Sequence, residues 1–127
     1  MRFLLDTHAI IWHFDDVFKL STKAAEIINN PKSILYISSV SLWEVAIKTN
    51  LNKLDLYFTL DELLDAVKDR DINVLQIEDE YLRALSSLPF IHKDPFDRLL
   101  IATALAEDLT FITMDGNIQK YDVKWEW

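Results

Sequence analysis

Short apolar runs alternate with helical patterns along almost the whole chain, and this alternation is the strongest constraint on its fold. Consecutive parallel strands need a helical crossover, and strands that helices cover on both faces consist of nearly continuous apolar residues. The sequence therefore predicts an α/β fold with a central, mainly parallel sheet. The expected strands cover residues 3–5, 34–37, 74–77 and 110–113, with a weaker fifth at 123–125.

Helix signals lie between these runs. Ser21 and Thr59 each precede a helical pattern as N-caps, and Thr59 is followed three residues later by Glu62, the spacing of a capping box. Asp94 and Pro95 supply an N-cap and a first-turn proline for the most strongly helical stretch. The expected helices or helical turns cover residues 9–12, 24–28, 42–51, 60–67, 79–88 and 96–107.

Length and composition are those of one globular domain. The chain has 127 residues with one Gly and three Pro, and no repeat or linker interrupts it, so we expect a single domain over residues 1–127. The absence of cysteine excludes disulfides, thiolate zinc sites and cysteine nucleophiles. The first apolar run reaches Asp6 too early to form the core of a signal peptide. We therefore expect a cytoplasmic protein that does not enter a membrane.

The charge balance is acidic, with 13 basic and 21 acidic residues and a net charge of −8. This balance argues against a nucleic-acid-binding protein with a broad basic face. An enzyme that acts on nucleic acid is still compatible with it. Divalent cations bound by clustered acids would reverse the local field where a phosphate approaches.

Four acidic residues stand where expected strands end. Asp6 directly follows the first strand, and Glu44 lies in the first helical turn after the second. Asp97 lies in the first turn of the helix at 96–107, and Asp115 lies two residues past the fourth strand. Because ligands bind at the carboxyl ends of parallel strands, these carboxylates are expected to meet at one edge of the sheet. Mg²⁺ and Mn²⁺ prefer oxygen ligands of this kind.

Each of these acids also has a purely structural interpretation. Glu44 stands at capping-box spacing from Ser41, and Asp97 stands at the same spacing from Asp94. The other two acids are of a type that is common in turns. From these residues taken singly, a metal site and a set of caps and turns both stay open.

Four blocks of the sequence carry a family resemblance. They are FLLDTHA at 3–9, SVSLWEVAIK at 39–48, HKDPFDRLLIA at 92–102 and TMD at 113–115. In this order they resemble the signature blocks of PIN-domain ribonucleases, in particular the VapC-like toxins of type II toxin–antitoxin pairs. The likeness spans nearly the whole chain, although Asn50 and Asn52 stand where we expect relatives to have a glycine turn.

The resemblance implies a PIN-like three-layer α/β/α sandwich and a metal-dependent endoribonuclease that hydrolyses RNA phosphodiester bonds. It places Asp6, Glu44 and Asp97 at the core acidic positions and Asp115 at a fourth, more variable one. The first three are expected to bind Mg²⁺ or Mn²⁺, and Asp115 to bind the metal or to orient the attacking water. The resemblance also implies a cognate antitoxin as protein partner and a homodimer.

Residues beside these acids have expected supporting roles. Asp94 is interpreted as an N-cap rather than a metal ligand. Thr7 and Thr113 are expected to orient neighbouring carboxylates or metal-bound water. Lys48 and Arg98 either contact phosphate or pair with a nearby carboxylate.

Histidines and tryptophans give weaker signals. No histidine has metal-ligand spacing, and nothing in the sequence supplies a residue to orient one for catalysis. The three histidines are His8, His13 and His92. The tryptophans either stack on RNA bases or pack in the core or an interface, and packing is the commoner role. They are Trp12, Trp43, Trp125 and Trp127.

Other families with acids at strand ends fit poorly. A phosphatase of the haloacid dehalogenase type needs a second aspartate two residues after the first, where this chain has His8. A response-regulator receiver needs adjacent acids close to its first strand, whereas Asp15 and Asp16 lie beyond a helical turn. The remaining alternative is a catalytically silent PIN-like scaffold that binds RNA or a protein partner. Intact acids at all four positions argue against it, because unpaired negative charge has no evident use in such a scaffold.

Overall fold

Five parallel strands form one sheet at the centre of the computed structural model, which describes all of residues 1–127. They are β1 (Arg2–Leu5), β2 (Ile34–Ser38), β3 (Asn73–Leu75), β4 (Thr110–Ile112) and β5 (Trp125–Glu126). The strand order is β3-β2-β1-β4-β5, and every neighbouring pair is parallel. The predicted parallel sheet is therefore confirmed. Its short fifth strand exists but lies at Trp125–Glu126, slightly later than the expected 123–125.

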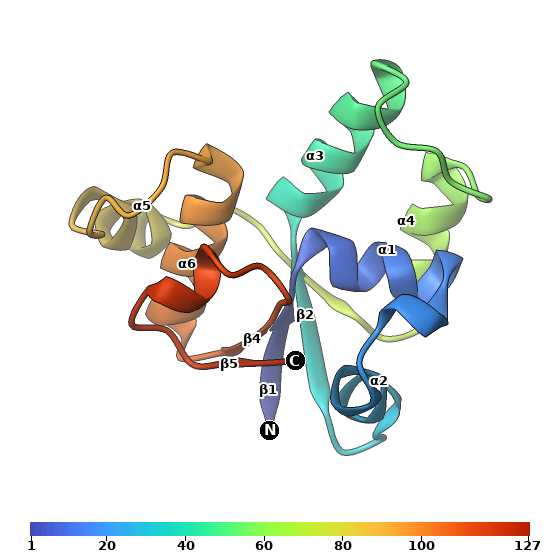
Figure 1. Cartoon of the computed structure of the whole chain (residues 1–127), viewed down its shortest axis with the longest axis horizontal. Helices are drawn as coiled ribbons and strands as arrows, with labels where there is room; N and C mark the ends of the chain where they lie inside the picture. The colour runs from blue at the N-terminus through green and yellow to red at the C-terminus, as the bar shows by residue number, and fades with distance from the viewer.

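Helices cover both faces of this sheet (Figure 1). One face carries α1 (Thr7–Asp15), α2 (Thr22–Asn29), α3 (Ser39–Asn50) and α4 (Leu60–Asp69). The other face carries α5 (Asp79–Ser86) and α6 (Pro95–Glu107). Two 3₁₀ turns, η1 (Val17–Lys19) and η2 (Ile118–Lys120), complete the chain. The result is the expected three-layer α/β/α sandwich. None of its helices has both the length and the apolar character that crossing a bilayer requires.

The central strand β1 supplies side chains to both halves of the core. Phe3 and Leu5 belong to a buried apolar cluster with α1, α2, α3 and α4. Leu4 belongs to a second buried cluster, which includes apolar residues of α6. Successive strand residues point to opposite faces, so a strand between two helical layers must be apolar at every position.

Three predicted helix starts are confirmed by their caps. Thr59 and Glu62 form both hydrogen bonds of a capping box at the start of α4. The side chain of Ser21 caps α2. Asp94 caps α6, with Pro95 in the first turn, so the interpretation of Asp94 as an N-cap is confirmed.

The start of α3 differs from the prediction. The helix begins at Ser39, with Ser38 as its N-cap. Ser41 is fully buried and its Oγ lies 2.8 Å from the hydroxyl oxygen of Thr7. Glu44 therefore lies in the second turn, and its interpretation as part of a capping box with Ser41 is wrong.

The turn after α3 is made without glycine. Asn52 has a φ of 54°, in the left-handed region of backbone conformation. Asparagine enters this region more readily than most residues because its short polar side chain can bond to nearby backbone. Asn52 thus takes the conformation for which a glycine was expected.

Candidate functional site

Asp6 connects the end of β1 to the start of α1. Its Oδ1 accepts a hydrogen bond from the backbone N–H of Thr7 at 2.7 Å, and its Oδ2 accepts one from the Thr113 hydroxyl at 2.8 Å. Only 6% of the residue is exposed. Burial raises the pKa of Asp6, and the bonds from Thr113 and Thr7 oppose this shift. Both carboxylate oxygens are therefore held in place at the edge of the sheet.

Glu44 is tied to Asp6 through Thr7. The hydroxyl of Thr7 donates to Oε1 of Glu44 at 2.9 Å, while its backbone N–H donates to Asp6. Glu44 is as buried as Asp6, and its Oε2 pairs with Nζ of Lys48 at 2.8 Å. Of the two roles expected for Lys48, pairing with a carboxylate is the one observed.

Asp97 approaches the same region from the first turn of α6. Its backbone N–H donates to Oδ1 of Asp94 at 3.1 Å, and its Oδ2 lies 3.1 Å from Nε2 of His92. Burial raises the pKa of Asp97 to about 7, against the effect of the His92 hydrogen bond. The nearby charges of Asp94, Asp6 and Asp115 raise it further. Asp97 is therefore close enough to the other acids for their charges to affect its ionisation.

Asp115 lies in the loop that follows β4. Its backbone N–H donates to Oγ1 of Thr113 at 3.1 Å, and its Oδ1 accepts a hydrogen bond from the Asn117 N–H at 2.8 Å. Thr113 thus contacts both Asp6 and Asp115. Its predicted role of orienting neighbouring carboxylates agrees with this geometry.

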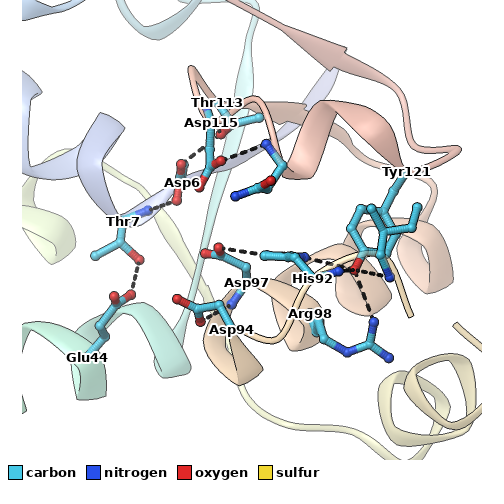
Figure 2. Close-up of polar contacts among 12 residues, drawn as sticks. Asp6, Thr7, Glu44, His92, Asp94, Asp97, Arg98, Thr113, Asp115 and Tyr121 are labelled. Atoms are coloured by element: carbon cyan, nitrogen blue, oxygen red, sulfur yellow. Dashed lines mark hydrogen bonds and ion pairs between the residues drawn. The ribbon is translucent and has the colours of Figure 1, made fainter. Parts of the chain in front are cut away.

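The acidic side chains surround a common space (Figure 2). They come from the ends of β1 and β4 and from α3 and α6. Among them, only Glu44 forms an ion pair with a Lys or Arg side chain. No three His, Asp or Glu side chains form a ready-made set of ligands in this structure. The donor chemistry nevertheless fits a hard divalent cation, because it consists of partly desolvated carboxylates whose repulsion such a cation would relieve.

His92 has orienting partners that sequence reasoning missed. Its Nδ1 lies 2.8 Å from the Tyr121 hydroxyl, and its Nε2 faces Asp97. A neutral imidazole with its proton on Nε2 satisfies both contacts, donating to Asp97 and accepting from Tyr121. Burial lowers the pKa of His92, but the bonds with Asp97 and Tyr121 outweigh it and raise the pKa. The expectation that nothing orients a histidine is wrong for His92, because Tyr121 is 29 residues away in sequence.

Arg98 also contacts Tyr121, the residue that orients His92. Its Nη1 donates to the Tyr121 hydroxyl at 3.0 Å and to the Pro89 carbonyl at 2.9 Å. Its guanidinium carbon lies 4.7 Å from the centroid of the Phe90 ring. Arg98 therefore holds the loop before α6. A carboxylate pair, one of the two roles expected for Arg98, is not formed.

Comparison with known proteins covers almost the whole chain. A sequence profile of the PIN domain matches residues 3–124. No curated protein matches the sequence. The match to the PIN domain rests on the sequence, and the structure is also similar to solved structures.

Similar solved structures come from several bacteria. VapBC2 from Rickettsia felis, bound to a DNA fragment from its promoter, has a TM-score of 0.72 at 18% identity, over 99% of this chain and 98% of that one. FitAcB from Neisseria gonorrhoeae has a TM-score of 0.67 at 18% identity, over 98% and 96% of the two chains. A toxin–antitoxin complex from Klebsiella pneumoniae has a TM-score of 0.66 at 19% identity, also over 98% and 96%. These structures share the fold of this chain. The profile match over residues 3–124 shows that the chain belongs to the PIN domain family.

Proposed function

We propose that this protein is a divalent-metal-dependent endoribonuclease and the toxin of a toxin–antitoxin pair. PIN domains are generally nucleases, and the chain belongs to that family. The observation that carries the proposal is the pair of buried carboxylates, Asp6 and Glu44, that Thr7 joins beside Asp97. Burying several acids together opposes folding unless positive charge compensates them, and within the protein Lys48 does so for Glu44 alone.

The proposed ligands are Asp6, Glu44 and Asp97, with Asp115 as a fourth ligand or as the group that orients the attacking water. Their donors are all oxygen, which supports Mg²⁺ or Mn²⁺ rather than a softer metal. When bound, such an ion activates water and stabilises the charge that develops on a phosphodiester during hydrolysis.

The surrounding hydroxyl groups fix the carboxylates before substrate arrives. The Thr7 hydroxyl donates to Oε1 of Glu44, and its backbone N–H donates to Oδ1 of Asp6. The Thr113 hydroxyl donates to Oδ2 of Asp6. Polar groups that are already oriented need no reorganisation during the reaction. Thr7 and Thr113 are therefore positioning residues in this proposal.

His92 has a corresponding role for Asp97. A proton held at Nε2 of His92 fixes Oδ2 of Asp97, while Oδ1 of Asp97 makes no hydrogen bond within the protein. In Figure 2 the Asp97 carboxylate points into the space that Asp6 and Glu44 also face, which supports its use as a metal ligand. His92 acts on Asp97 in this account and does not touch the reacting atoms.

A role as a toxin is supported by the similar solved structures. VapBC2 and FitAcB share this fold, and the Klebsiella pneumoniae structure is a toxin–antitoxin complex. We therefore propose that this protein cuts RNA and that a cognate antitoxin restrains it. We also propose that it forms a homodimer, as the family resemblance implies.

Two measurements test the proposal. Purified protein should cleave single-stranded RNA with Mg²⁺ or Mn²⁺, lose this activity in EDTA and recover it when Mg²⁺ is added back. Expression in bacteria should stop growth, and co-expression of the protein encoded beside it should restore growth. Undiminished cleavage in EDTA would contradict the metal site. Harmless expression of a soluble, folded protein would favour a non-toxic nuclease or a silent scaffold.

A further inference from the structure

A pocket of about 250 Å³ lies beside the acidic side chains, at the same edge of the sheet. Asp6 and Asp115 line it, so it is continuous with the candidate site. The rest of its wall includes His8, Trp12, Met114 and Trp127. These residues come from the first turns of α1, the loop after β4 and the segment after β5.

Three aromatic rings form one side of this pocket. The rings of His8 and Trp12 have centroids 5.5 Å apart, and those of Trp12 and Trp127 are 5.8 Å apart with an angle of 63° between their planes. His8 is exposed, and Met114 is 53% exposed. The pocket is therefore an open, aromatic surface rather than a closed part of the core.

The charges around the pocket disfavour an anionic occupant. No Lys or Arg lines it, and the two carboxylates of Asp6 and Asp115 would repel a phosphate placed there. In a nucleotide, the neutral part with a flat aromatic face is the base. Bases stack on aromatic side chains, and this stacking tolerates differences in sequence.

The size of the pocket points to a small, flat group. Pockets for drug-sized ligands have volumes of about 300–1,000 Å³. At 250 Å³ this pocket is just below that range, which suits a fragment such as a single base. A base stacks on protein most readily where the nucleic acid is single-stranded, because no pairing has to be broken there.

We propose that this pocket binds one unpaired nucleobase of the RNA, next to the phosphodiester bond that is cut, an inference that rests on the proposed function. The base stacks on Trp12 and His8, and its own phosphate lies outside the pocket, toward the divalent cation that the proposed function places among the acidic side chains. The pocket thus sets the position of the RNA strand relative to Asp6.

The experiment is a thermodynamic cycle between one base and one side chain. Binding is measured by fluorescence anisotropy with the Asp97→Asn variant, which removes cleavage, and a labelled single-stranded RNA. In a set of otherwise identical RNAs, one base at a time is removed to leave an abasic nucleotide. Trp12→Ala, His8→Ala and Met114→Ala are each added to the Asp97→Asn protein. Phe18→Ala is the matched control, because Phe18 is an aromatic residue that is 94% exposed and lies outside the pocket.

We expect one RNA position at which loss of the base weakens binding by about 5- to 150-fold, the range of one base–aromatic stack. Trp12→Ala should weaken binding of the intact RNA in the same range. The RNA that lacks that base should no longer respond to Trp12→Ala, because the two changes remove one interaction. Phe18→Ala should leave every RNA unaffected. Because Trp12 also packs against the core, a variant that fails to fold is replaced by His8→Ala and Met114→Ala, whose side chains are exposed.

Additive losses from the base and the side chain would overturn the proposal, as would a folded protein that binds no RNA. An unchanged affinity for RNA, together with weaker binding of the protein encoded by the neighbouring gene, would assign the pocket to a side chain of that partner instead. Cleavage by the wild type is measured in parallel. Base coupling without cleavage would contradict the proposed function alone, and cleavage without base coupling would contradict the pocket alone.

Discussion

The hydroxyl of Thr113 donates to Oδ2 of Asp6 at 2.8 Å, joining two residues that are 107 positions apart in the chain. Neither residue is appreciably exposed, at 0% for Thr113 and 6% for Asp6. The parallel pairing of β1 with β4 brings them together, because both follow directly on these neighbouring strands. The fold of the sheet therefore determines how this carboxylate is oriented.

Removing this hydroxyl should reduce both stability and cleavage. Thr113→Val keeps the shape of the side chain but leaves an oxygen of Asp6 without its donor. We expect a loss of about 1–3 kcal/mol in the free energy of unfolding, measured with denaturant. The loss in cleavage rate should be about 10- to 100-fold, as for other groups that orient metal ligands.

Thr113→Ser is the matched control for this change, since it retains the hydroxyl. It should recover most of the cleavage rate that Thr113→Val loses. Equal rates in the valine variant and the wild type would show that orientation of Asp6 by Thr113 does not contribute to activity.

Divalent cations should stabilise the folded protein. A ligand that binds only the native state at about 100 times its dissociation constant adds roughly 2.7 kcal/mol to stability. Thermal melting of the wild type should therefore shift upward as Mg²⁺ is added, and EDTA should reverse the shift. Asp97→Asn should reduce the shift by weakening metal binding, while raising the stability of the metal-free protein by removing one repelling charge. A melting temperature that does not respond to saturating Mg²⁺ would count against the proposed ligands.

The metal-free protein should become less stable as the pH rises from about 4 to about 7. Burial raises the pKa of Asp97 from 3.8 to about 7, so in this range the unfolded state has lost a proton that the folded state keeps. Stability falls with pH wherever the folded state binds more protons than the unfolded state. The raised pKa values of Asp6 and His92 act in the same direction.

Comparing variants isolates the part of this slope that belongs to Asp97. Denaturant unfolding in EDTA across this pH range should give a shallower fall for Asp97→Asn than for the wild type. Asp79→Asn is the control, because the side chain of Asp79 is 83% exposed on α5. The same slope in all three proteins would mean that Asp97 is not the group that titrates.

Tyr121 should be necessary for the loop that carries His92. Its hydroxyl oxygen accepts from the backbone N–H groups of Ile91 at 3.3 Å and His92 at 3.2 Å, besides its contact with Arg98. Tyr121→Phe leaves these donors without a partner, so we expect a loss of about 1–3 kcal/mol in the free energy of unfolding. Cleavage should fall as well, because His92 then loses the group that orients it toward Asp97.

Tyr57→Phe serves as the control for the tyrosine hydroxyl, since Tyr57 is 93% exposed. Addition of Mg²⁺ at high concentration should recover part of the activity of Tyr121→Phe if His92 acts only by positioning Asp97. Identical stability and activity in Tyr121→Phe and Tyr57→Phe would show that orientation of His92 by Tyr121 does not contribute to activity.

The helix starts and strands that the sequence predicts correctly are those whose signals lie within the element itself or next to it. The start of α6 follows from Asp94 and Pro95, which stand next to the helix that they begin. The strands follow from apolar runs that helices must cover on both faces. The start of α3 was misplaced because three serines, at 38, 39 and 41, all suit an N-cap. Only tertiary packing, which buries Ser41 against Thr7, decides among them.

The partners within the site depend on contacts that are distant in sequence. Glu44 receives its hydrogen bond from Thr7, 37 residues away, and His92 contacts Tyr121, 29 residues away. The sequence pattern placed the acids at strand ends, but it contains no signal for which hydroxyl group faces which carboxylate. That information arises only when the sheet brings the ends of β1 and β4 and the start of α6 together.

The most direct test of the central claim is the rate of RNA cleavage by single amide variants of the proposed ligands. Asp6→Asn, Glu44→Gln and Asp97→Asn each remove one charge at nearly constant volume, and Asp79→Asn removes one at an exposed site. With saturating Mg²⁺, and with folding verified by circular dichroism, we predict that the first three lose cleavage by at least about 100-fold. Asp79→Asn should match the wild type. Wild-type rates in all three ligand variants would contradict the claim that these carboxylates form one metal-dependent active site.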